Sequence, residues 1–136
     1  MRICPDTNLL VRAIVAPATI EDGRQAEIAQ RNLRNAEMVV LTLPVLCEVA
    51  WVLQSAYRTP VAGIVRTIRA LIDASNVVCD RAVIEFGLGV AESGGDFADG
   101  VIAETGFLAG ADHFVSFDRR AVRLVAATGR NVLVPS

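Results

Sequence analysis

The stretch "MRICPDTNLLVRAIVA", residues 1–16, places an apolar run of strand length before an aspartate and then an amphipathic run of helix length. This pattern predicts a strand over 1–5 and a helix over 7–16, joined at Asp6. Aspartate is a good N-cap at such a junction, and ligands of open α/β sheets bind beyond the carboxyl ends of the strands. Asp6 is therefore a candidate both for capping and for chemistry.

The same alternation continues along the chain and predicts an α/β fold with a mainly parallel sheet of about five strands flanked by helices. Further strands are expected over 38–42, 76–79, 113–117 and 131–134, and further helices over 22–35, 43–57, 61–74, from about 80 to the break at 93–95, over 96–110 and over 118–128. A chain of 136 residues without a linker or repeat is expected to form a single domain over 1–136.

The composition is apolar, with 53% hydrophobic residues and a mean hydropathy of +0.46. Part of the surface is therefore expected to be covered by a partner or a second copy. The longest apolar run, Val39–Leu53, is interrupted by polar residues and by Pro44, so no membrane span is predicted. The N-terminus lacks the apolar core of a signal peptide, and we expect a cytoplasmic protein.

The cysteines and the basic residues indicate which kinds of site and ligand the protein favours. Cys4, Cys47 and Cys79 are widely spaced in apolar stretches, which predicts buried thiols and neither disulfides nor a zinc site. The net charge of −2 lacks the overall basic footprint of a dedicated nucleic-acid binder. All 13 basic residues are arginine, which suits bidentate phosphate contacts but also fits a GC-rich coding sequence.

A second stretch, "LPVLCEVAWVL" at 43–53, contains one charged residue, Glu48. Its helical neighbours include Pro44, Val45 and Trp51, so the sequence predicts a carboxylate without a polar stripe around it. A buried carboxylate must be paired, protonated or bound to a cation. Pairing with an arginine and binding of a cation both remain open at this point.

Three other acids follow or begin predicted elements: Asp118 after the strand at 113–117, and Asp96 and Asp99 at the start of the helix at 96–110. Capping and helix-dipole effects alone would explain each of them. If they gather with Asp6 and Glu48, a divalent cation would relieve their repulsion, and oxygen ligands favour Mg²⁺ or Mn²⁺.

The single histidine, His113, is at the start of a predicted strand and is interpreted as structural, and the three cysteines lie in apolar stretches, so no Ser-His-Asp or Cys-His device is expected. Catalysis, if present, is expected to use metal-activated water on an electrophile such as a phosphodiester.

Four stretches carry a family resemblance: "DTNLLVR" at 6–12, "EVAWVL" at 48–53, "GGDFADGVIAE" at 94–104 and "FVSFDRRAVRL" at 114–124. In this order and spacing they resemble the PIN-domain ribonucleases, and most closely the VapC toxin half of VapBC toxin–antitoxin pairs. The resemblance spans nearly the whole chain. It implies a three-layer α/β/α fold and a metal-dependent endoribonuclease.

The resemblance also implies roles for individual residues. The acidic quartet that holds Mg²⁺ or Mn²⁺ would be Asp6, Glu48, Asp99 and Asp118, with Asp96 as a further metal-site acid ranked below Asp99. Polar support would come from Asn8 and Ser116. Separately from the resemblance, four arginines lie after the same strand ends as these acids, so some of them are expected to contact the RNA backbone: Arg12, Arg119, Arg120 and Arg123. The last three would otherwise form the solvated face of the last helix. Gly100 and Glu104 depart from the alanines more usual in relatives, and Gly100 is expected to weaken its helix by about 1 kcal/mol and loosen the hold on Asp99.

Partners implied by the resemblance are an RNA substrate, a second copy in a homodimer, and a VapB-type antitoxin whose C-terminal segment lies in an apolar groove. The helices predicted over 43–57 and 61–74 are candidates for the covered surface.

Other classes of protein share part of this pattern. Receiver domains and haloacid-dehalogenase phosphatases also cluster aspartates at strand ends, but both need a lysine that this chain lacks. A structure-specific DNA nuclease of the same superfamily would need additional DNA-gripping elements. The serious alternative is a catalytically inactive PIN-like module that binds RNA or protein.

Overall fold

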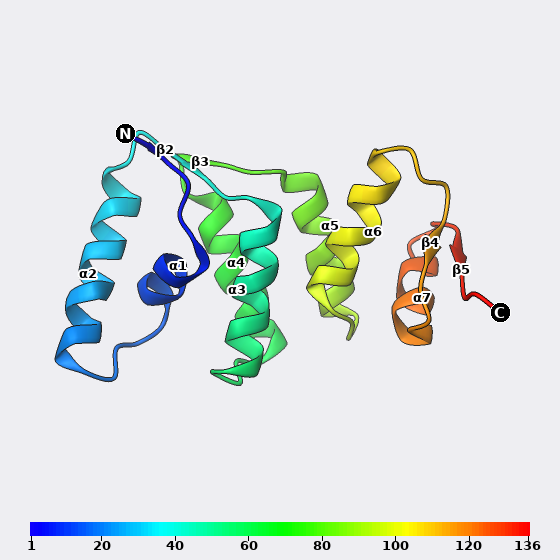
Figure 1. The fold of residues 1–136 in the computed structure, drawn as a ribbon, viewed down its shortest axis with the longest axis horizontal. Helices are drawn as coiled ribbons and strands as arrows, with labels where there is room; N and C mark the ends of the chain where they lie inside the picture. Colours follow the sequence, from blue (N-terminus) through cyan, green and yellow to red (C-terminus); the bar gives the residue numbers. More distant parts are fainter. The chain divides into compact units, whose positions relative to one another are not determined.

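Each strand of this protein is short, and a helix follows every strand but the last, as the alternating pattern predicts. The computed structural model describes residues 1–136 and contains the elements labelled in Figure 1. The strands are β1 (Arg2–Ile3), β2 (Met38–Val40), β3 (Val77–Val78), β4 (Phe114–Val115) and β5 (Val132–Leu133). The helices are α1 (Thr7–Ile14), α2 (Ile20–Asn35), α3 (Leu43–Ser55), α4 (Val61–Asp73), α5 (Arg81–Glu92), α6 (Phe97–Leu108) and α7 (Arg119–Ala126).

All the predicted elements are present, and the predicted α/β class with parallel strands is confirmed. Every strand pair is parallel: β1 with β2, β2 with β3, and β4 with β5. The strands pair as a three-stranded sheet in the order β1-β2-β3 and a two-stranded sheet of β4 and β5, where the sequence had suggested one sheet of five. The observed strands are shorter than the predicted ones, because Pro5 and the polar residues at the strand ends do not pair with a neighbouring strand.

The chain divides into two compact units, Met1–Asp80 and Arg81–Ser136, and each is described by itself. In the first unit, α1 and α2 connect β1 to β2, and α3 and α4 connect β2 to β3. Parallel neighbours require such crossover connections, because a tight hairpin can join only antiparallel strands. The core of this unit consists of fully buried aliphatic side chains from both helix pairs and the sheet: Leu10, Val39, Leu46, Val49 and Ile68.

The second unit is built on the antiparallel helices α5 and α6, followed by β4, α7 and β5. The turn between α5 and α6 contains Gly94, whose φ of +97° lies in the left-handed region that favours glycine. Four side chains are fully buried in this unit: Val83, Ile84, Leu88 and Val125. The prediction of one domain over 1–136 remains a prediction.

Candidate active site

Two candidate acids lie in the first unit, at the start of α1 and in the middle of α3. Asp6 is the N-cap of α1, and its Oδ1 accepts a hydrogen bond from the Leu9 backbone N–H at 2.8 Å. The next residue, Thr7, donates its hydroxyl to Oε2 of Glu48 on α3. This bond joins the first turn of α1 to α3, so the chain segment that carries Asp6 is held beside Glu48.

Glu48 is exposed, which corrects the expectation that it is buried in an apolar helix. The buried side of α3 consists of Val45, Leu46, Val49, Ala50 and Leu53. Glu48 lies on the other side, together with exposed Pro44 and with Trp51, whose surface is 66% exposed. The prediction failed because it counted Trp51 and Pro44 as core residues. The need for a cation therefore cannot be argued from burial of Glu48.

The second unit contains three candidate acids, and two of them cap helices. Asp96 is the N-cap of α6, where its Oδ1 accepts from the Ala98 N–H at 3.0 Å. Asp118 is the N-cap of α7 and accepts from the N–H groups of Arg120 at 3.0 Å and Ala121 at 3.1 Å. The capping explanation is therefore correct for Asp6, Asp96 and Asp118, and it leaves the outer carboxylate oxygens for other ligands.

Asp99 differs from these caps. It lies in the first turn of α6 and is partly buried, and burial raises its pKa above the ordinary value of 3.8. The nearby carboxylates of Asp96 and Asp118 raise the pKa of Asp99 further, because each disfavours a third negative charge. These three acids of the second unit therefore share one electrostatic environment.

Ser116 contributes to the placement of Asp118. Its Oγ accepts a hydrogen bond from the backbone N–H of Asp118 at 3.0 Å. Ser116 itself follows β4, and its own N–H donates to the carbonyl of Leu133 in β5 at 3.1 Å. The β4–β5 pairing thus determines where Asp118 leaves the sheet. Asn8, the other expected support, is exposed on α1.

Two glycines bring α6 close to its neighbours. A Cβ at Gly100 would lie 2.7 Å from the backbone Cα of Gly87 on α5, and one at Gly95 would lie 2.6 Å from Leu124 on α7. The Gly87 Cα is backbone and cannot move aside alone, whereas the Leu124 atom is the end of a flexible side chain, so the constraint is stricter at Gly100. Gly100 is buried in the α5–α6 contact, so it permits tight packing next to Asp99. The expectation that it loosens the hold on Asp99 considered only helix propensity.

The four arginines expected to contact RNA have different environments. Arg12 donates to Asp22 at 2.5 Å in a half-exposed ion pair, so Asp22 partly neutralises the charge of Arg12 within the first unit. Arg119, Arg120 and Arg123 are exposed along α7 and form no ion pair. The guanidinium of Arg120 lies next to Gly94, where a Cβ would be 2.9 Å from Nη2.

The candidate acids of each unit fit a hard divalent cation by their chemistry, because all of their ligand atoms are carboxylate oxygens. The raised pKa of Asp99 is the effect that a nearby cation would reverse. Within the structure, no group of three or more His, Cys, Asp or Glu side chains is arranged as a metal-holding cluster. The candidate acids therefore match a divalent cation in ligand type and in charge, and they are not arranged as a metal-binding cluster.

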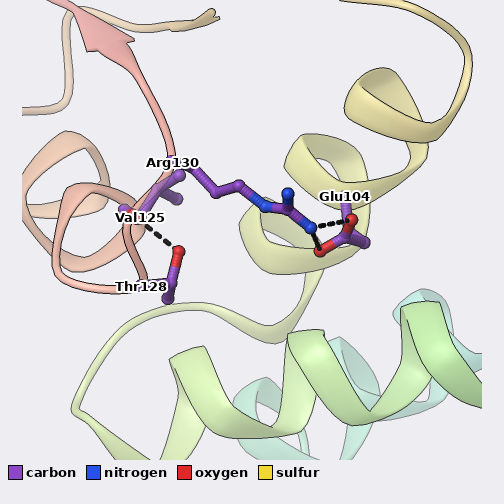
Figure 2. A network of polar contacts seen from close by, with 4 residues as sticks. All are labelled: Glu104, Val125, Thr128 and Arg130. Carbon is purple, nitrogen blue, oxygen red and sulfur yellow. Dashed lines mark hydrogen bonds and ion pairs between the residues drawn. The ribbon is translucent and has the colours of Figure 1, made fainter. Parts of the chain in front are cut away.

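Sequence reasoning missed residues near the candidate acids in each of the two units. Thr7 was overlooked between the better known positions of "DTN", although a hydroxyl beside an acid is a detectable signal. The pair formed by Glu104 and Arg130 was also missed, because the two residues are 26 positions apart and only the tertiary structure joins them (Figure 2).

The cysteines and the hydrophobic segments give less information about the function of the protein. All three cysteines are free thiols, and Cys4 is exposed, contrary to the expectation of burial. None of the helices combines the length and the apolar character needed to span a membrane.

An apolar cavity of about 380 Å³ lies in the first unit. Its walls come from α1, α2, β2, α4 and β3, and include Leu10, Ile14, Leu33, Leu41 and Leu71. Arg34 and Asn76 provide polar groups among these apolar walls. Of the two helices expected to form an apolar binding surface, α4 contributes to the cavity and α3 does not.

The model of the PIN domain family matches residues 3–127. No curated protein matches the chain.

Proposed function

Because the chain belongs to the PIN domain family, whose members are generally nucleases that use divalent metal ions, we propose that it is a metal-dependent endoribonuclease. In this proposal it is the VapC-type toxin of a type II toxin–antitoxin pair and acts on cytoplasmic RNA. The observation that supports this proposal best is the set of Asp96, Asp99 and Asp118 in the second unit, where burial and then the neighbouring carboxylates raise the pKa of Asp99. Capping accounts for Asp96 and Asp118, but it does not account for the partly buried Asp99 beside them.

The proposed metal ligands are Asp6, Glu48, Asp99 and Asp118, with Asp96 in a lesser role. A bound Mg²⁺ or Mn²⁺ supplies an activated water and offsets the negative charge that develops on the phosphate. Four of these five acids are held by helix N-termini or by a hydroxyl, and Asp99 is the exception. Thr7 orients the Glu48 carboxylate, and the backbone N–H groups of α7 fix one oxygen of Asp118. Such fixed orientation is what a metal-binding or catalytic group requires.

RNA would be bound through the exposed arginines of α7. Arg119 and Arg123 carry charges that no carboxylate of the chain neutralises, and Arg119 directly follows Asp118. Contacts of this kind attract phosphates without reading sequence. They offer a local basic surface in a chain whose net charge is −2. Arg12 is a weaker candidate, because it would have to leave Asp22.

The proposed partners are an antitoxin and a second copy of the chain. The apolar cavity of the first unit supports a partner that inserts aliphatic side chains, and Arg34 at its wall would favour an acidic group on that partner. Exposed Trp51 and Tyr57 add apolar surface on and just after α3. These features are compatible with both partners.

The test is cleavage of total cellular RNA by the wild-type protein and by Asp6→Asn, with Mg²⁺, with Mn²⁺ and with EDTA. Asparagine also caps helices well, so Asp6→Asn should remain folded while losing a metal ligand. We expect discrete products that require metal and fall by at least about 100-fold in the variant. The control, Asp112→Asn, makes the same chemical change at a fully exposed carboxylate outside the candidate site.

The alternative, an inactive module that binds RNA or protein, predicts different results. Metal would not be needed, no condition would give cleavage, and Asp6→Asn would bind RNA as the wild type does. That outcome would exclude the ribonuclease proposal.

A further inference from the structure

Glu104 is the one buried charged residue of the chain, with 5% of its surface exposed. Arg130 Nη2 donates to both of its carboxylate oxygens, at 2.7 Å to Oε1 and 3.0 Å to Oε2 (Figure 2). A buried carboxylate without this partner would be strongly unfavourable, so the two side chains must stay together in the folded protein.

Two aromatic rings complete the environment of Arg130. Its guanidinium carbon lies 5.3 Å from the ring centre of Phe107 on α6 and 5.9 Å from that of Phe86 on α5. Both distances are within the range of cation–π attraction. Arg130 therefore binds three groups on two helices at once, and it does so from the turn that precedes β5.

The backbone of that turn is itself fixed. The Thr128 hydroxyl donates to the Val125 carbonyl at 2.6 Å, as Figure 2 shows, and the Gly129 N–H donates to the Ala126 carbonyl at 3.0 Å. Gly129 has a φ of +89°, which is favourable for glycine and reverses the chain after α7. Arg130 thus leaves a defined turn and is not on a free loop.

A continuous series of bonds leads from this pair to Asp118. The carbonyl of Asn131, next to Arg130, accepts from the Phe114 N–H at 3.0 Å, which begins the β4–β5 ladder. The ladder ends with the Ser116 N–H on Leu133, and the Ser116 hydroxyl oxygen then accepts from the Asp118 N–H. At the other end, Glu104 is on the same helix as Asp99, about 7.5 Å farther along its axis.

We propose that Glu104 and Arg130 are positioning residues that set the separation between Asp99 on α6 and Asp118 at the end of β4. Like charges on Asp99 of α6 and on Asp118 at the start of α7 favour movement of α7 and β4 away from α6. The pair holds the β5 side of this sheet against the middle of α6 and opposes that movement. Neither residue touches the proposed ligands, and their effect on metal binding rests on the proposed function.

The geometry makes a specific prediction about which ion is affected. Mg²⁺ demands nearly ideal octahedral geometry with short bonds, whereas Ca²⁺ accepts variable geometry. A small loss of order between Asp99 and Asp118 should therefore weaken Mg²⁺ more than Ca²⁺. A general loss of stability would weaken both ions alike.

The experiment compares wild type, Glu104→Gln, Arg130→Lys and Glu21→Gln. Glu104→Gln removes the buried charge with little change of shape, and Arg130→Lys keeps the charge but loses the planar fork. The control makes the same Glu-to-Gln change in the exposed Glu21–Arg24 pair of the first unit, where the atoms are 3.7 Å apart. Calorimetry measures Mg²⁺ and Ca²⁺ binding, and amide hydrogen exchange is followed without metal.

We expect Glu104→Gln and Arg130→Lys to weaken Mg²⁺ binding by about tenfold and Ca²⁺ by less than about threefold, with no change in Glu21→Gln. Without metal, exchange should accelerate at the N–H groups of Phe114, Ser116 and Ala121 while that of Leu88 in α5 stays slow. If Glu104→Gln does not fold, Arg130→Lys is judged by the same criteria.

Two results would overturn the proposal: equal weakening of both ions with uniform acceleration of exchange, or no change at these amides in either variant. Failure of the proposed function has a different signature, because then the wild type would bind neither ion. In that case the selective exchange pattern alone decides whether the pair positions Asp118.

Discussion

The contact between α5 and α6 at Gly100 gives the sharpest stability prediction for this protein. Helix propensity alone says that Gly100→Ala should stabilise α6 by about 1 kcal/mol. The structure predicts the opposite, because the new Cβ would lie 2.7 Å from the Gly87 Cα and 3.1 Å from the Val90 Cβ. Neither of these atoms is the end of a flexible side chain.

The magnitude follows from how far the helices must move. The contact with the Gly87 Cα is about 0.7 Å shorter than the 3.4 Å at which ordinary contact begins, so α6 and α5 must separate by roughly that amount. Overpacking of this kind costs about 1–3 kcal/mol and outweighs the gain in propensity. We expect Gly100→Ala to lower the free energy of unfolding by about 1–2 kcal/mol.

The matched control is Gly89→Ala on the adjacent helix. Gly89 is helical and exposed, and a Cβ there would meet nothing within 4 Å. Only propensity acts at this site, so Gly89→Ala should raise the free energy of unfolding by up to about 1 kcal/mol. The two variants make the same chemical change and should therefore have effects of opposite sign.

The assay is urea unfolding followed by far-UV circular dichroism, with the slope of the transition compared between variants. Circular dichroism is preferred over fluorescence because the single tryptophan, Trp51, lies in the first unit, whereas Gly100 lies in the second. If Gly100→Ala proves as stable as Gly89→Ala, the close approach of α5 and α6 does not exist, and the reasoning about the support of Asp99 fails with it.

Three further predictions concern the capping and titrating residues. Because the pKa of Asp99 is raised in the folded protein, ionisation of Asp99 above pH 3.8 lowers the stability of the fold. Asp99→Asn should therefore raise the melting temperature of the metal-free protein at pH 7, and this gain should shrink toward pH 3.8. An equal gain at both pH values would contradict this. Asp118→Ser should keep the α7 cap and stability but lose RNA cleavage, whereas Asp118→Ala should lose both, with about 1 kcal/mol of stability as measured by urea unfolding. Thr42→Ala should lower the free energy of unfolding by about 1 kcal/mol, because Thr42 caps α3 through the Val45 N–H, and RNA cleavage should be unchanged. A loss of cleavage without a loss of stability would show that Thr42 has a role beyond capping.

Local signals in the chain account for the elements and their order. Apolar runs of strand length, amphipathic runs of helix length and capping residues such as Asp6, Thr42 and Asp118 are properties of near neighbours, and the structure agrees with them to within a few residues at each end. The acids of the candidate site were found in the same way, since each follows a strand or begins a helix.

Which side of a helix is covered, and which distant residues meet, depended on the tertiary structure. Periodicity counted Trp51 as core and so predicted a buried Glu48, but packing covers only the other face of α3. Propensity treated Gly100 as a weak point, although its missing Cβ is what allows α6 to approach Gly87. The bond between Glu104 and Arg130 joins positions that no local pattern relates. Sequence by itself determined the elements and the candidate acids because those depend on neighbours in the chain; only the tertiary structure decided exposure, close approach and long-range pairing, because each depends on atoms brought together by folding.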